Sequence, residues 1–520
     1  MKTIERPLKE LVKGAGIYLA GLIISKLFTY LYRLMIARTG TEQYGILSLG
    51  LSFIGFLAIF ATLGMNNGVL RYVSYYRGKE DDSHIRGVVL FASRVTLFLG
   101  LLIAFLFFVF SGWISQTFFP HIDYDKLSLI FKLVALVIPL AALNFIFYAA
   151  FEAFQKLQYE VYTRNIIETS SKLILSAVLI YLGVSVIGLT VAYVFAVFLA
   201  FIFTLYFLEK KVYPIFRGKV VPLYINKELL SYSWPLVLSS FFIIILGSID
   251  TWMLGYFKNA SDVGVYNAAY PTAQLILLIP YAFLALFLPI LTELYARGEK
   301  SSFESICQIT TKWIFILTLL PLSLILFFSK DFLGVFFGQV YSAGYLALIM
   351  LSIGFFVYSA AMAFQNILMV VGKTKLIFFN YLVVTVFAAI LNIFLIPRYG
   401  VNGAAFVTSL SYILLSILIL VESYRFAHVK FFKLHYFLKS LVGSGVAILV
   451  TFLVLNFFVN TVSIYIIVIL SLVASLLYLL FLFFTKAFSK EDLMIVDAIQ
   501  KKFGYNLLGR IKFFRRFLEP

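Results

Sequence analysis

Two cations lie inside the first long apolar stretch of the chain, Leu11 to Ala37, at a spacing suited to holding an anion. Lys26 and Arg33 are seven residues apart, close to two helical turns, so they belong to one helix face. A charge at this depth of a bilayer costs at least ~2.5 kcal/mol, so it normally faces protein or a water-filled cavity. We interpret the pair as candidate anion ligands, with snorkelling or a structural ion pair as the alternative.

Two further cations extend this pattern in the first half of the chain. Arg94 and Lys172 are expected roughly 9–12 Å along their predicted helices from the inner surface, at ~1.5 Å per residue. Arginine can grip an oxyanion with two parallel hydrogen bonds, whereas lysine acts as a point charge. Glu168 precedes Lys172 by four residues on one helix face, so it could neutralise part of that charge.

The composition places these residues in a polytopic membrane protein. Of the 520 residues, 62% are hydrophobic and 13% are charged, whereas soluble domains carry about 25% charged residues. The net charge of +18 is typical of basic loops at an anionic cytoplasmic membrane surface, and we expect no nucleic-acid partner. The single cysteine, Cys307, cannot form an intrachain disulfide.

Apolar stretches recur along the whole chain and predict an all-α fold with fourteen transmembrane helices. With the N-terminus inside, every inner segment holds at least two basic residues and no outer loop holds more than one. This bias predicts cytoplasmic N- and C-termini in the cell (plasma) membrane. The predicted helices span 12–37, 44–70, 88–111, 129–153, 165–182, 185–208, 231–254, 264–292, 308–329, 344–370, 376–396, 402–424, 438–459 and 463–485.

An internal repeat relates the two halves of the chain. Tyr148–Gln155 and Tyr358–Gln365 match at five of eight positions, and Glu42–Gly45 is a weaker echo of Asp262–Gly264. Six helices per half give both halves the same orientation, with a cavity expected between them. The predicted divisions are an N-lobe at 1–208, a cytoplasmic linker at 209–230, a C-lobe at 231–424, helices 13 and 14 at 425–485 and a basic amphipathic tail at 486–520.

An ordered set of motifs resembles the polysaccharide-transport (Wzx-type) oligosaccharide flippases of the MOP (MATE-like) superfamily. The resemblance covers nearly the whole chain and implies two six-helix lobes around a central cavity. It also implies transfer of a lipid-linked oligosaccharide from the cytoplasmic to the outer leaflet by alternating access. The motifs are Ala37–Gly45, Leu63–Tyr72, Ser233–Leu236, Asp250–Phe257, Val263–Tyr266, Phe337–Tyr341 and Ile396–Ala405.

The chemistry of the candidate residues suits such a substrate, which usually carries a phosphate or pyrophosphate. An anion can cross the membrane only if its charge is compensated in a shielded path, and Lys26, Arg33, Arg94 and Lys172 are our candidate substrate-binding cations. Asn66 and Asn67 could hydrogen-bond sugar hydroxyls, although interhelical hydrogen bonding is the commoner role of asparagine in membranes.

Asp250 is the notable acid of the second half, and we consider it a candidate for ion coupling or a solvated helix cap. The expected partners are a lipid-linked anionic oligosaccharide, membrane lipids and a coupling ion, either Na⁺ or H⁺, with the protein as a monomer. We expect no catalytic residue and no cofactor. We also expect no metal, because the acidic loop around His121 lacks further clustered ligands.

Two other functions remain as alternatives. A cation-coupled multidrug or organic-cation antiporter of the MATE type would need intramembrane carboxylates in the first half, where the first helix instead carries cations. A membrane glycosyltransferase or polysaccharide polymerase would need a sizeable outer loop with catalytic acids. The largest outer loop, about residues 112–128, is short for that role. We therefore do not expect an enzyme.

Overall fold

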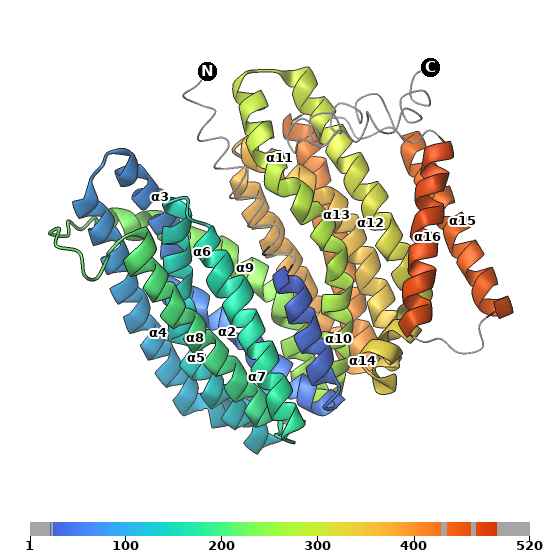
Figure 1. The fold of residues 1–520 in the computed structure, drawn as a ribbon, viewed down its shortest axis with the longest axis horizontal. Coiled ribbons are helices and arrows are strands. Elements are labelled where there is room, and N and C mark those ends of the chain that lie inside the picture. The colour runs from blue at the N-terminus through green and yellow to red at the C-terminus, as the bar shows by residue number, and fades with distance from the viewer. Residues whose placement is uncertain (1–20, 22–23, 428–433, 459–463, 486–520) are drawn as a thin grey trace. The chain divides into compact units, whose positions relative to one another are not determined.

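The computed structural model describes residues 21, 24–427, 434–458 and 464–485, and in these ranges all regular structure is helical (Figure 1). Residues 24–37 form the first described helix. In the first part of the chain the elements that follow are α2 (Thr41–Thr62), α3 (Met65–Gly78), α4 (Asp82–Phe118), α5 (Tyr124–Ala153), α6 (Gln158–Glu160), the π-helix η1 (Val161–Glu168), α7 (Thr169–Tyr181), α8 (Val186–Phe207) and the π-helix η2 (Leu208–Val212).

The second part of the chain continues in the same all-helical manner. Its elements are α9 (Asn226–Phe257), α10 (Ala260–Ala273), the 3₁₀-helix η3 (Gln274–Leu277), α11 (Leu278–Ala296), α12 (Lys300–Phe336), the 3₁₀-helix η4 (Gln339–Gly344), α13 (Tyr345–Val370), α14 (Thr374–Ala427), α15 (Leu434–Phe458) and α16 (Ile464–Phe484). The predicted amphipathic tail at 486–520 lies outside the described residues.

Ten of the described helices are long and apolar enough to cross a membrane, so the chain is a multi-pass membrane protein. The remaining predicted spans differ for identifiable reasons. Span 12–37 lies partly outside the described residues, 165–182 begins in η1, and 264–292 is divided among α10, η3 and α11. Spans 376–396 and 402–424 merge into α14, which is interrupted by non-helical backbone at Gly400. The count of fourteen stays a prediction.

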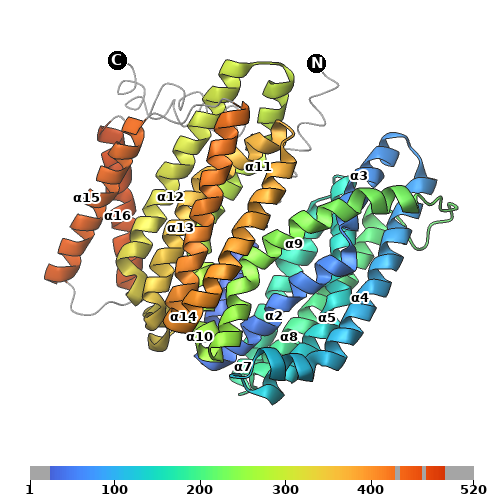
Figure 2. The same cartoon turned by 180° about the vertical axis from the view of Figure 1, so that it is seen from behind.

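The chain forms two compact units, and the candidate site lies in the first of them. This unit contains the residues up to Ala269 together with Tyr381–Val407. Figure 2 shows α9 running alongside α2, two helices that belong to this unit. The second unit contains Tyr270–Asn380 and the residues from Thr408 onward. The lobe boundaries expected from the repeat stay a prediction.

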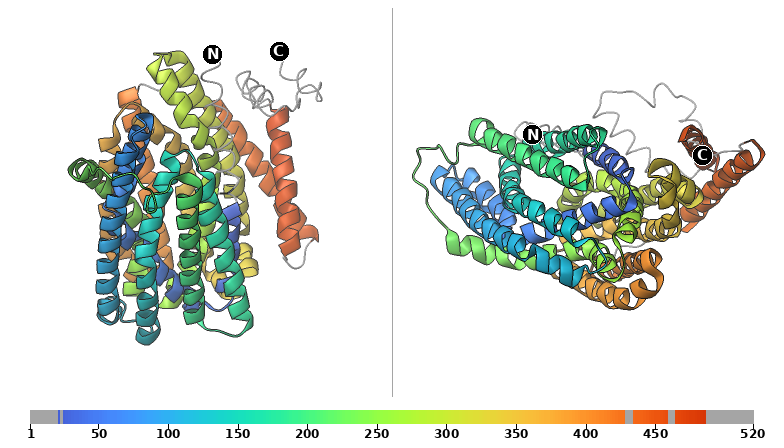
Figure 3. Two further views of the ribbon diagram at one scale, coloured as in Figure 1. Left: turned by 60° about the vertical axis from the view of Figure 1, so that its left-hand side comes forward. Right: turned by 90° about the horizontal axis from the view of Figure 1, so that it is seen from below.

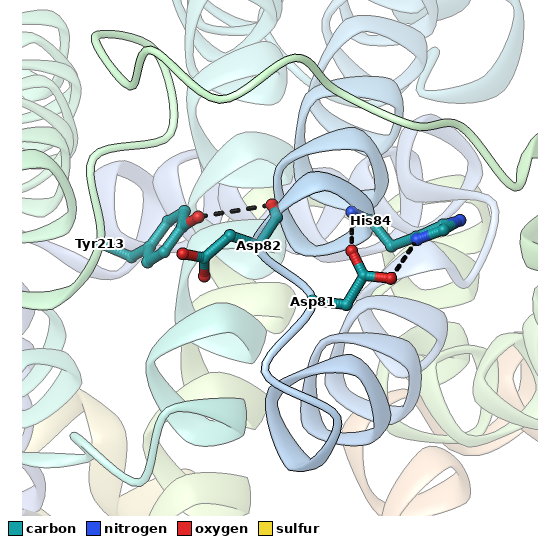
Figure 4. A network of polar contacts seen from close by, with 4 residues as sticks. All are labelled: Asp81, Asp82, His84 and Tyr213. Atoms are coloured by element: carbon teal, nitrogen blue, oxygen red, sulfur yellow. Dashed lines mark hydrogen bonds and ion pairs between the residues drawn. The ribbon is translucent and has the colours of Figure 1, made fainter.

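Capping residues begin two of the long helices of the first unit. The Asp81 carboxylate precedes α4 and accepts a hydrogen bond from the backbone N–H of His84 at 3.1 Å. It also contacts His84 Nδ1 at 2.6 Å (Figure 4). Asp123 caps α5 in the same way, accepting from the backbone N–H of Lys126 at 3.1 Å. Each cap satisfies an N–H group that has no partner inside its helix.

A break divides the predicted span 44–70 into α2 and α3. Leu63 and Gly64 both have left-handed backbone, with φ of 45° and 68°. A right-handed helix cannot continue through this conformation, so α2 ends there. Glycine adopts it without strain, whereas leucine rarely does. A Cβ on Gly64 would lie 2.6 Å from the carbonyl oxygen of Ser233, and one on Gly68 would lie 2.5 Å from Ser233 Oγ. The two glycines therefore let α3 approach α9 closely.

The segment 213–225, expected to be a linker, is bound to the start of α4. Arg86 donates through Nε to the Ile215 carbonyl oxygen at 2.7 Å, and its two Nη atoms donate to the carbonyl oxygens of Phe216 and Val220. Tyr213 Oη donates to the Asp82 carbonyl oxygen at 3.4 Å (Figure 4). We call residues 213–225 the strap, because these bonds attach it to α4 along its length.

The second unit has its own packed core. The buried Tyr478 of α16 donates through Oη to the Ile316 carbonyl oxygen of α12 at 3.0 Å. α15 and α16 pack against each other (Figure 3) and against α12. Within α14, Asn380 Nδ2 donates to Glu422 Oε2 at 2.7 Å, which joins its two ends. None of the candidate site residues lies in this unit.

Candidate functional site

The helix at 24–37 carries the two cations first identified from the sequence. Lys26 is exposed, and Arg33 is partly buried. Arg33 Nη1 donates to Tyr44 Oη at 3.3 Å, and Tyr44 Oη donates to the carbonyl oxygen of Asn267 at 2.9 Å. Arg33 is therefore connected through the buried Tyr44 of α2 to α10. Lys26 and Arg33 interact electrostatically, as their shared helix face predicts.

Lys172 on α7 lies buried beside this helix, with 7% of its surface exposed. Its ammonium is 5.5 Å from the ring centre of Tyr32 and 5.8 Å from that of Tyr193, within the range of cation–π attraction. No ion pair within 4.0 Å joins Lys172 to Glu168 in the described part of the chain, although the two charges do interact over a longer distance. Lys172 is therefore not held in a close ion pair with Glu168, so its ammonium can contact another anion.

Arg164 joins these cations, and sequence reasoning missed it. It was assigned to an inner connection, but it lies on the π-helix η1 and interacts electrostatically with both Lys26 and Lys172. Arg164 Nη1 is paired with Glu160 Oε1 at 3.1 Å, and its guanidinium is 5.8 Å from the Tyr148 ring centre. π-helical turns are rare and concentrate at functional sites. Periodicity gives no signal for such a turn.

These side chains form one charged group, which we call the cationic cluster. Its members comprise four basic and two acidic side chains, so basic groups outnumber acidic ones. An oxyanion held between the basic groups would be stabilised by charge-assisted hydrogen bonds. The members are Lys26, Arg33, Arg164 and Lys172 with Glu160 and Glu168.

Buried polar atoms next to the cluster add hydrogen-bonding capacity. The hydroxyl groups of Tyr32, Ser176 and Tyr148 are buried. Tyr32 and Ser176 lie close enough to interact with each other, and Tyr148 interacts with Thr163, but none of the three hydroxyls makes a hydrogen bond of normal geometry within the described chain. Buried polar atoms are almost always bonded to protein or water, so each unsatisfied atom calls for a partner. Water or the polar part of a ligand would satisfy them, since both offer donors and acceptors.

The structure does not bring Arg94 into the cationic cluster. Its side chain is exposed, and Nη1 donates to Tyr224 Oη of the strap at 3.3 Å. Asn66 and Asn67 occupy the first turn of α3 after the break and are partly buried. In the described residues neither asparagine side chain forms a recorded hydrogen bond. Their roles as substrate ligands stay predictions.

Asp250 is buried, with 3% of its surface exposed, so it is not the solvated cap that was one of the two expectations. Its Oδ2 accepts from Tyr266 Oη at 2.9 Å, and its Oδ1 accepts from Asn392 Nδ2 at 2.7 Å. The three residues come from α9, α10 and α14. These two hydrogen bonds hold the carboxylate in place among the three helices.

Residues 11–295 match the model of the family described as "Polysaccharide biosynthesis protein". Residues 235–397 also match the MatE family model. No described group of three or more histidine, cysteine, aspartate or glutamate side chains has metal-binding geometry.

Three curated relatives are similar to this chain. An uncharacterised membrane protein of Methanocaldococcus jannaschii is 24% identical over 84% of this chain and 88% of its own length. A Shigella flexneri protein named as a candidate O-antigen transporter is 24% identical over 73% of this chain and 89% of its own length. A Haloferax volcanii protein assigned as a low-salt glycan biosynthesis flippase is 25% identical over 39% of this chain and 43% of its own length.

Among solved structures, the inward closed conformation of the lipid II flippase MurJ has a TM-score of 0.70. It is 18% identical, and the match covers 89% of this chain and 97% of that one. The likeness shows a shared fold. Because the first family model covers more than half of the 520 residues, the chain belongs to the family described as "Polysaccharide biosynthesis protein".

Proposed function

We propose that this protein flips an anionic, lipid-linked saccharide precursor from the cytoplasmic to the outer leaflet by alternating access. The observation that carries the proposal is the cationic cluster, in which Arg33, Arg164, Lys26 and the buried Lys172 lie among membrane helices. The names of two relatives, an O-antigen transporter and a glycan flippase, support the same substrate class. The fold of a lipid II flippase supports it as well.

The physical task is to carry a phosphorylated headgroup across a medium that cannot solvate it. Arg33 and Arg164 offer planar forks for phosphate oxygens, and Lys172 offers a fixed charge between two aromatic rings. The buried Tyr32 and Ser176 hydroxyls, which lie close to each other, suit the remaining oxygens. The lipid tail stays in the bilayer, because its transfer out of hydrocarbon would cost about 0.8 kcal/mol per CH₂ group.

Ion coupling at Asp250 is part of this proposal. Its carboxylate lies among α9, α10 and α14, and hydrogen bonds from Tyr266 and Asn392 hold its two oxygens in place. Binding of Na⁺ or H⁺ there would change the charge at a buried group and so favour one conformation over another. The protein acts as a monomer in the plasma membrane, with both termini in the cytoplasm.

Complementation of a flippase-deficient strain tests the function, with the lipid-linked glycan measured in each leaflet. Arg33→Ala and Lys26→Ala should abolish glycan export while the variants reach the membrane in normal amounts. Lys132→Ala is the matched control, since Lys132 lies in a membrane helix near the Phe108 ring and outside the cluster. Normal surface glycan in both cluster variants would overturn the anion site.

A MATE-like antiporter is the second candidate, and the MatE match over residues 235–397 favours it. This function predicts export of organic cations along a sodium or proton gradient. The same strain, loaded with a cationic dye, separates the two. Dye export without glycan transfer would replace the flippase by the antiporter, whereas glycan transfer without dye export would exclude the antiporter.

A further inference from the structure

The first turns of α2 and α10 meet at an unusually close seam. A Cβ on Gly45 would lie 2.7 Å from the carbonyl carbon of Ala260 and 2.9 Å from the backbone nitrogen of Gly264. A Cβ on Gly264 would lie 3.0 Å from the carbonyl carbon of Thr41. Real Cβ contacts under 3.0 Å are essentially absent, so these helix ends touch backbone to backbone. We call this contact the glycine seam.

The glycine seam is reciprocal, as expected if the predicted internal repeat relates its two segments. Each glycine faces the carbonyl of the residue four positions before the other glycine, Ala260 for Gly45 and Thr41 for Gly264. The two segments are the echo pair Glu42–Gly45 and Asp262–Gly264 found in the sequence. Equivalent surfaces that meet in this manner form a self-complementary contact, like that of a twofold dimer. The repeat therefore places both glycines at one surface, on the predicted outer side.

Hydrogen bonds connect the glycine seam to the cationic cluster. Thr41 Oγ1 donates to Ser261 Oγ at 3.1 Å across the seam itself. One turn deeper, Tyr44 Oη donates to the Asn267 carbonyl oxygen at 2.9 Å and accepts from Arg33 at 3.3 Å. Tyr44 thus connects the glycine seam to the cationic cluster. The bond that it donates joins it to α10, and the bond that it accepts joins it to Arg33.

We propose that Tyr44 is a positioning residue that couples anion binding at Arg33 to opening of the glycine seam. The inference rests on the proposed function, because it takes Arg33 as a ligand of the substrate anion. A bond accepted by a hydroxyl polarises it and strengthens the bond that it donates. With Arg33 in place, the Tyr44–Asn267 bond is strengthened and the seam is held closed.

The direction of the coupling follows from competition for Arg33. An anion that draws the guanidinium away removes this polarisation, so the Tyr44–Asn267 bond weakens and the glycine seam opens more readily. By reciprocity, an open seam frees Arg33 for the anion. Substrate loaded from the cytoplasm therefore favours opening on the outer side, which is the order of events that export needs.

Disulfide formation across the glycine seam measures its closure. Thr41→Cys and Ser261→Cys are combined in a Cys307→Ala background, and crosslinking is followed in proteoliposomes with and without farnesyl diphosphate as the anionic probe. Tyr44→Phe removes the whole bond to Asn267, so without the probe it should slow crosslinking about fivefold, the change expected for one net hydrogen bond. In otherwise native protein the probe only weakens that bond, so it should slow crosslinking by a smaller factor. In Tyr44→Phe the probe should add little.

A matched control is Tyr478→Phe, which also removes a buried tyrosine hydroxyl bonded to a backbone carbonyl but lies in the other unit. It should crosslink like the native chain and respond to the probe normally. Equal probe responses in the native and Tyr44→Phe proteins would overturn the coupling and leave the anion site standing. A native protein that ignores the probe would overturn both the coupling and Arg33 as an anion ligand.

Discussion

Alanine in place of Gly45 should force the glycine seam apart. The new methyl carbon would overlap the Ala260 carbonyl oxygen and would lie 2.7 Å from the carbonyl carbon, whereas carbon atoms normally pack at about 3.5–4.0 Å. The contact with the oxygen is the closer of the two, so the two helix ends must separate by more than about 1 Å. Overpacking of this kind costs roughly 1–3 kcal/mol, and the partner atoms belong to rigid backbone that cannot rotate away.

Gly55→Ala on the same helix is the control. Nothing lies within 4 Å of a Cβ at Gly55, so this change gains the helix propensity of alanine, about 0.5–1 kcal/mol, without a clash. Because Gly45→Ala gains the same propensity, the difference between the two variants isolates the clash. That difference of roughly 1–3 kcal/mol corresponds to a loss of about 5- to 150-fold in the closed-seam population.

The rate of crosslinking between cysteines at positions 41 and 261 measures the population in which the glycine seam is closed. Thermal unfolding in detergent measures overall stability. Gly45→Ala should crosslink far more slowly than Gly55→Ala. Gly264→Ala should have a smaller effect, because its Cβ would stand 3.0 Å from the Thr41 carbonyl carbon. The reasoning fails if Gly45→Ala crosslinks and melts like Gly55→Ala, since the backbones would then not be in contact in the working protein.

Three further variants test other parts of the structure. Lys172→Met should abolish transport, whereas the free energy of unfolding should stay equal or rise by about 1 kcal/mol, because the change replaces a buried basic group with an apolar side chain of similar length. A large loss of stability would instead indicate a structural role for Lys172. Arg86→Gln should release the strap, so trypsin in inside-out vesicles should cleave after Arg217 faster than in the native chain, and unchanged cleavage would contradict its role. Hydrogen bonds from the backbone N–H of His84 and, to a lesser extent, from its side chain lower the pKa of Asp81. The ionised Asp81 carboxylate therefore stabilises the folded protein. This stabilisation is complete above the unfolded pKa near 3.9 and is lost as pH falls through the lower folded pKa. Melting curves between pH 6 and pH 2 should show this acid-dependent loss reduced in Asp81→Asn, and identical pH profiles would contradict the assignment.

Much of the architecture could be predicted from the sequence, because hydropathy and charge bias are local properties of a segment. Long apolar runs must be helical in a bilayer, where the backbone has no other partner for its polar groups. The break at Leu63 and Gly64 could not be predicted, because Leu63 is an unusual residue for left-handed backbone. Its conformation depends on the close packing of α3 on α9, which is a tertiary contact.

The candidate site divides in the same way. Lys26, Arg33 and Lys172 could be identified because a cation in an apolar span is costly and therefore conspicuous. Arg164 could not, because its approach to Lys172 depends on the π-helical turn of η1. Arg94 satisfied the same sequence criterion as Lys172, yet it bonds to Tyr224 of the strap.

By itself, the sequence determined that this chain crosses the membrane many times and carries basic residues within the apolar spans of its first half, and it predicts a repeat of the helix pattern. These properties follow from composition and from residues near each other along the chain. Only the tertiary structure decided which cations share one electrostatic environment and which glycines meet. Such contacts join segments more than 200 residues apart, as Gly45 and Gly264 are, and their geometry depends on how whole helices pack.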